Sequence, residues 1–206
     1  MPFSGRWFYG DALFIVDPWV WLALGTGLVW SWYRRRRSHP VEYFPAQLVL
    51  SLTALYMAGM WGSGLLARNI IAQESEKLFS RSGGRIMAGP LPLTPFTRSF
   101  VLEQDSVYWV GTFRWLADSQ VDLKSLRSFP RTRPIHPALV AAESTQVMRR
   151  FLSWARYPTY RVYQTAADSY MVQVVDLRYA RDSGRDFGSL RIPVSLREGP
   201  DRSRTD

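Results

Sequence analysis

The sequence has no cysteine among its 206 residues, which excludes a disulfide scaffold, a thiolate metal site and a cysteine nucleophile. Histidine is nearly as scarce: His39 and His136 are its only occurrences, so a self-contained multi-histidine metal centre is not expected. Hydrophobic residues make up 47% of the chain, which excludes a disordered or low-complexity protein. What remains is a chain whose charged and apolar residues are unevenly distributed.

Positive charge predominates, with a formal net charge of +9, and nearly all of it comes from arginine because Lys77 and Lys124 are the only lysines. Such a balance is compatible with nucleic acid, with anionic lipid or with the cytoplasmic flank of a membrane segment. Four consecutive arginines, at residues 34–37, directly follow an apolar stretch, and this placement favours the membrane interpretation. No nucleic-acid partner is therefore expected.

The first apolar stretch covers residues 12–33 (ALFIVDPWVWLALGTGLVWSWY), and Asp17 is its only charged residue. A helix of this length rises about 33 Å, which is enough to cross the hydrocarbon core of a bilayer. Asp17 directly before Pro18 suits the start of a helix, and tryptophans near both ends are typical of the two membrane interfaces. We expect a transmembrane helix here; the alternative is a buried helix of a soluble domain.

A second apolar stretch covers residues 46–67, after a loop that contains Pro40 and Pro45. Its later half holds Gly59, Gly62 and Gly64, small residues that allow close packing against another helix. We therefore expect a membrane region over residues 1–72 with two transmembrane helices and the lipid bilayer as its partner. The arginines predict that the loop of residues 34–45 is cytoplasmic and that the chain beyond the second helix lies outside.

The rest of the chain predicts a small α+β domain. Residues 73–97 are expected to form an amphipathic helix and a proline-rich linker, residues 98–197 the extramembrane domain, and residues 198–206 a polar tail. Alternating side chains predict strands, and helical spacing predicts one main helix. These segments are strands at 98–103, 107–115, 160–164, 170–179 and 187–196, a loop at 119–137 and a helix at 138–155. The predicted fold class is a membrane α plus α+β protein with an antiparallel sheet.

Asp11 and Asp17 are the most interesting candidates for chemistry, because they bracket the outer end of the first apolar stretch. Two carboxylates at a membrane boundary could bind a divalent metal ion or act as acid and base. The alternative is that Asp17 caps the helix and Asp11 is a solvated charge. The catalytic residues and the identity of the metal are not readable from the sequence.

Several segments resemble the membrane-bound metal-dependent hydrolase family of bacterial inner-membrane proteins. They occur in the same order in both, and the resemblance extends over nearly the whole chain. They are residues 2–11 (PFSGRWFYGD), 14–19 (FIVDPW), 92–96 (PLTPF), 151–158 (FLSWARYP) and 175–179 (VDLRY). The resemblance implies a multi-pass protein of the bacterial inner membrane with a divalent-metal hydrolase activity.

Members of that family normally begin with further membrane helices that carry a His- and Asp-rich signature, including a Thr-His-Ser element. This sequence contains no such element and starts inside the family pattern. The first hypothesis is therefore the C-terminal part of a metal-dependent hydrolase whose other ligands lie upstream, with Asp11 and Asp17 near the metal. The alternative is a non-enzymatic, membrane-anchored module that displays an extracytoplasmic α+β domain for binding.

Overall fold

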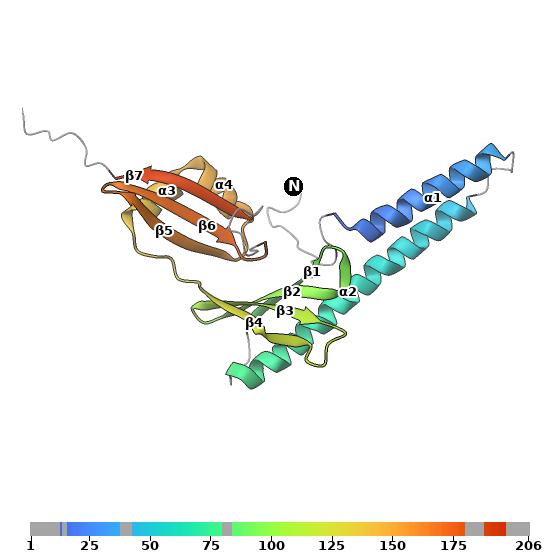
Figure 1. Cartoon of the computed structure of the whole chain (residues 1–206), viewed down its shortest axis with the longest axis horizontal. Coiled ribbons are helices and arrows are strands. Elements are labelled where there is room, and N and C mark those ends of the chain that lie inside the picture. Colours follow the sequence, from blue (N-terminus) through green and yellow to red (C-terminus); the bar gives the residue numbers. More distant parts are fainter. Residues whose placement is uncertain (1–12, 14–15, 38–42, 80–83, 180–187, 197–206) are drawn as a thin grey trace, which may run out of the picture. The chain divides into compact units, whose positions relative to one another are not determined.

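The computed structural model describes residues 13, 16–37, 43–79, 84–179 and 188–196. In chain order the helices and strands are α1 (Pro18–Arg36), α2 (Phe44–Phe79), β1 (Arg85–Leu91), β2 (Thr94–Gln104), β3 (Val107–Arg114), β4 (Val121–Pro130), α3 (Pro137–Ser144), α4 (Gln146–Trp154), β5 (Pro158–Ala166), β6 (Ser169–Asp176) and β7 (Ser189–Ser195). The strands form one sheet in the order β1-β2-β3-β4 and another in the order β5-β6-β7 (Figure 1). The expected mixture of long apolar helix and α+β structure is thus confirmed.

Helices α1 and α2 lie side by side and run in opposite directions (Figure 1). Helix α1 begins at Pro18 rather than at residue 12, because Asp17 caps it in an extended conformation. Helix α2 is 36 residues long, so the expected apolar helix and the amphipathic helix after it form one continuous element.

Within the described residues, α2 alone is long and apolar enough by composition to cross a membrane. Helix α1 ends in three arginines and carries many tryptophans, which lower its mean hydropathy. The second transmembrane helix therefore stays a prediction.

The first sheet packs against the later half of α2. Met60, Gly64, Ala67 and Ile71 follow helical spacing along one face of α2 and are buried. Buried side chains of the strands complete this core: Met87, Ala88, Phe100, Leu102 and Phe113.

The prediction of a proline-rich linker before residue 98 is wrong, because residues 85–91 and 94–97 belong to strands β1 and β2. Pro90 lies in an edge strand, Pro92 in the turn and Pro95 at the start of a strand, which are positions that tolerate proline. The predicted loop at 119–137 is also wrong over β4. The charged residues of β4, such as Lys124, lie on the other edge of the sheet, where water solvates them.

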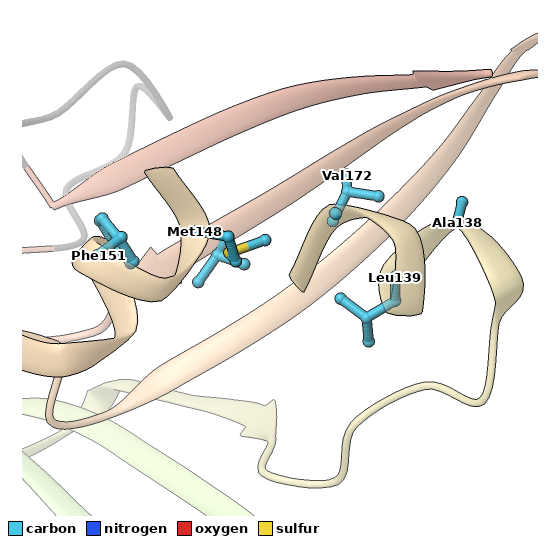
Figure 2. Packing of buried hydrophobic residues seen from close by; sticks show 7 residues of the cluster. Ala138, Leu139, Met148, Phe151 and Val172 are labelled. Carbon is cyan, nitrogen blue, oxygen red and sulfur yellow. The ribbon is translucent and has the colours of Figure 1, made fainter. Parts of the chain in front are cut away.

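The second sheet carries α3 and α4 on one face. Val162, Val172 and Ile192 occupy one register row across β5, β6 and β7. Figure 2 shows Val172 and the helix side chains Leu139, Met148 and Phe151 in the core between helices and sheet. The three strands predicted at 160–164, 170–179 and 187–196 are confirmed as strands β5, β6 and β7, with somewhat different bounds.

The single helix predicted over 138–155 is wrong, because it is broken at Thr145. This residue is extended, and its hydroxyl oxygen accepts a hydrogen bond from the Met148 amide, which starts α4.

The described chain also divides differently from the expected domains. One compact unit comprises residues 1–102 and 111–126, and the other comprises 103–110 and 127–206. Strand residues from 98 onward were expected to belong to the extramembrane domain. Most of β1–β4 is instead in the unit of the long helices, because β1 and β2 pack on α2.

Two tyrosines of the second unit, one buried and one partly buried, make its stability depend on pH. Burial raises the pKa of Tyr108, whose ring meets the edge of Tyr157, and burial also raises the pKa of Tyr160. A tyrosine whose pKa is higher in the folded than in the unfolded chain stabilises the fold. This stabilisation is fully present below the unfolded pKa of about 10 and is lost as pH rises through the folded pKa. We expect alkaline unfolding curves of Tyr108→Phe to fall less steeply above pH ~10 than those of the wild type. Identical curves would contradict this.

Candidate functional site

The most prominent functional feature is an exposed apolar helical hairpin, defined as α1 with residues 44–59 of α2. Large apolar side chains cover both helices and point outward. They are Trp21, Leu22, Leu28, Val29 and Trp30 on α1, and Leu48, Leu50, Leu52, Leu55 and Met57 on α2. Contiguous apolar surface of this kind marks an interaction with a membrane or a partner, because water disfavours it.

Two threonine hydroxyls of the hairpin have hydrogen-bond partners within their own helices. The Thr26 hydroxyl donates to the Leu22 carbonyl at 2.9 Å, and the Thr53 hydroxyl donates to the Val49 carbonyl at 2.8 Å. Polar groups that are satisfied in this way cost little in an environment without water. The hairpin therefore has an apolar outer surface, and its threonine hydroxyls also suit a lipid environment.

At the open end of the hairpin, where α1 begins, Asp17 forms hydrogen bonds to both helices. One carboxylate oxygen, Oδ1, accepts hydrogen bonds from the backbone amides of Trp19 at 3.0 Å and Val20 at 3.2 Å. The other oxygen, Oδ2, accepts the hydroxyl of Tyr56 at 3.1 Å. Asp17 is only 8% exposed. The predicted helix cap is confirmed, and the same side chain also ties α1 to α2.

The predicted metal pair is not tested by this geometry. Asp11 lies outside the described residues, so its distance from Asp17 is not part of the structure. Among the residues that the structure does describe, no three His, Asp or Glu side chains gather closely enough to hold a metal ion. His136 instead caps α3, where its Nδ1 accepts the Ala138 amide at 3.1 Å. The divalent metal ion stays a prediction, whereas both oxygens of Asp17 already accept hydrogen bonds.

The closed end of the hairpin combines arginines with aromatic rings. The guanidinium carbon of Arg36 lies 4.2 Å from the centre of the Trp32 ring, and that of Arg37 lies 4.5 Å from the centre of the Tyr33 ring. Such cation–π pairs are favourable, and aromatic residues next to arginine are typical of the cytoplasmic membrane interface. The two ends of the hairpin therefore differ in charge, which gives it a direction.

Close packing of the two helices depends on Gly27. A Cβ atom placed on Gly27 would lie 2.9 Å from the Val49 Cγ2 atom, whereas one placed on Gly25 would meet nothing within 4 Å. We expect Gly27→Ala to lower the free energy of unfolding of the full chain in detergent micelles by about 1–2 kcal/mol, because the helices must separate. Gly25→Ala is the matched control and should leave it unchanged or raise it. Equal effects of the two variants would contradict this role of Gly27.

Arg98 is a structural residue at this site that the sequence did not reveal. It lies on β2 and is fully buried. Its Nη2 donates to the Met60 carbonyl of α2 at 2.6 Å and to the Ser63 hydroxyl at 2.7 Å, and its Nη1 donates to the Ala88 carbonyl at 3.3 Å. One side chain thus joins β1, β2 and α2 just beyond the hairpin. The small residues of α2 were the available signal, since Gly64 leaves room for this guanidinium.

A second buried cluster joins two of the segments that carry the family resemblance. Asp176 accepts hydrogen bonds from the Arg156 amide at 2.9 Å and from the Arg178 Nη2 atom at 2.7 Å. The same Nη2 donates to the Trp154 carbonyl at 3.0 Å. Both ionic side chains are almost fully buried. Asp176 and Arg178 thus form a buried ion pair that holds the two segments together.

Neither a protein-family model nor a curated protein nor a solved structure matches this chain.

Proposed function

We propose that this protein is a membrane-anchored, non-enzymatic binding module of the bacterial inner membrane. In this proposal α1 and α2 both cross the bilayer, and the sheets and their helices lie on the outer side. The observation that carries the proposal is the exposed apolar hairpin with internally satisfied hydroxyls and arginines at one end.

The polar contacts of Asp17 favour the anchor over the hydrolase. Its two oxygens accept the hydrogen bonds that start α1 and hold Tyr56 of α2. A carboxylate used in this way serves the geometry of the hairpin. The metal-dependent hydrolase remains the hypothesis that the family resemblance implies. In that hypothesis the metal ligands other than Asp11 and Asp17 lie on upstream membrane helices.

Orientation gives the direct test of the proposed topology. Because the chain has no cysteine, single-cysteine variants can be labelled cleanly. Tyr43→Cys lies at the closed end of the hairpin, and Lys124→Cys lies on β4; both side chains are exposed. In intact bacterial cells, an impermeant maleimide should label Lys124→Cys and should label Tyr43→Cys only after the membrane is opened. Labelling of both positions, or of Tyr43→Cys alone, in intact cells would contradict the proposal.

Metal titration tests whether this chain binds a divalent metal ion on its own. Calorimetry of the purified chain in detergent with Mn²⁺, Mg²⁺ or Zn²⁺ should give no saturable heat if the chain is a binding module. Saturable binding that Asp17→Asn abolishes, in a variant that still folds, would instead support the metal-dependent hydrolase.

A further inference from the structure

The end of the first sheet nearest the hairpin carries three exposed apolar side chains, which we call the apolar rim: Leu93, Phe96 and Leu116. Their exposed fractions are 72%, 52% and 81%. Leu93 lies in the turn between β1 and β2, and Phe96 lies three residues further along. The Trp115 amide donates to the Phe96 carbonyl at 2.9 Å, which places Leu116 next to the same end of β2.

The rim is continuous with the open end of the hairpin. The indole Nε1 of Trp19, in the first turn of α1, donates to the Leu93 carbonyl at 3.3 Å. Along β2, Phe96 shares a face with Arg98, which contacts α2, because alternate residues of a strand point to the same side. The sheet edge and the start of α1 therefore lie at the same level of the hairpin (Figure 1).

Leu93 has no structural reason to be a leucine. Its φ is 71°, a left-handed conformation that glycine adopts without strain and that a side chain disfavours. Its side chain is also mostly exposed, so the leucine contributes little to the core. A strained, exposed leucine in the turn is explained if its side chain is buried by something outside the protein.

The length of the hairpin identifies what covers the rim. From Pro18 to Tyr33, before the first arginine, α1 rises only about 24 Å, whereas the hydrocarbon core of a bilayer is ~30 Å thick. If the hairpin spans the bilayer, the end of the sheet at the level of Trp19 must be drawn into the outer interface. Apolar side chains on a protein surface bind at this depth because their burial in acyl chains is favourable.

We infer that the apolar rim inserts into the outer leaflet, so that the first sheet is seated in the membrane surface by a second, monotopic contact. This inference rests on the proposed membrane function of the hairpin. It names the lipid bilayer as the occupant of Leu93, Phe96 and Leu116, and it fixes which end of the sheet faces the lipid.

Environment-sensitive labels on single cysteines test the inference. The full chain is reconstituted in vesicles of phosphatidylethanolamine and phosphatidylglycerol, with a nitrobenzoxadiazole label at Leu93→Cys or Leu116→Cys. The matched control is Lys124→Cys, an exposed position of the same unit. Leu28→Cys, exposed on α1, reports on the hairpin itself. All four side chains lie on the surface, so labelling leaves the core intact.

We expect the labels at 28, 93 and 116 to be quenched by a lipid-borne quencher and reduced by aqueous dithionite about tenfold more slowly than the label at 124. If 28 is protected while 93 and 116 react as fast as 124, the inference is overturned and the hairpin proposal stands. If 28 also reacts as fast as 124, the hairpin proposal itself fails. The two failures are thus distinguishable.

Discussion

Replacing Asp176 by alanine is expected to lower the free energy of unfolding of the second unit by about 3–5 kcal/mol. The carboxylate is fully buried and accepts hydrogen bonds from the Arg156 amide and from the guanidinium of Arg178. Without it, the Arg178 guanidinium stays in the interior and loses its counter-charge. The measurement is denaturant unfolding of the full chain in micelles, followed by the fluorescence of the tryptophans and by hydrogen exchange of the Arg156 amide.

Two further variants make that prediction specific. Asp176→Asn keeps one acceptor oxygen but removes the charge. It is expected to lower the free energy of unfolding by less than Asp176→Ala does. Asp168→Ala changes an exposed aspartate in the same unit and is expected to alter stability by less than about 0.5 kcal/mol. If Asp176→Ala were as mild as Asp168→Ala, the ion pair would not hold the segments around residues 156 and 178 together.

Arg98→Ala is expected to lower the free energy of unfolding of the first unit by about 3 kcal/mol. The guanidinium is fully buried and donates to α2 and β1 at three atoms, so its removal loses hydrogen bonds of a charged donor and leaves a cavity. We expect the sheet to separate from α2 first. Limited proteolysis within β1 to β4 in the folded chain is the measurement, with cleavage faster than in the wild type.

Lysine and a surface arginine provide the controls. Arg98→Lys should restore only part of the free energy of unfolding that Arg98→Ala loses, because an ammonium group cannot reproduce the several planar N–H donors of the guanidinium. Arg114→Ala removes an exposed arginine of the same unit, whose side chain lies 3.5 Å from Asp122, and should cost less than about 1 kcal/mol. Loss of stability with Arg114→Ala but not with Arg98→Ala would contradict the account of how the sheet is held.

Local patterns predicted the elements whose signals lie within a few residues. Asp17 before Pro18 predicted the helix cap, and the alternation in residues 170–179 predicted β6. The break between α3 and α4 was missed although Thr145 is a residue type that commonly caps helices; the continuous apolar spacing on both sides outweighed it. Strands β1 and β4 were missed because their prolines and charges are tolerated only at sheet edges, and edge positions are set by the tertiary fold.

The site itself was only partly predictable for the same reason. The apolar stretches and Arg34–Arg37 can be read directly in the sequence, and so can the candidate carboxylate Asp17. The Tyr56 partner of Asp17 is 39 positions away, and the Met60 partner of Arg98 is 38 positions away. No periodicity relates such pairs, because they are brought together only when α1 and β2 pack on α2.

Alkaline carbonate washing followed by flotation of the membranes tests the central claim most directly. The claim is that the α1–α2 hairpin is embedded in the bilayer. We expect the full chain to remain with the floated membranes after the wash, because apolar burial in lipid does not depend on charge. Release of the chain into the supernatant, as for a peripheral protein held by its arginines, would contradict the claim.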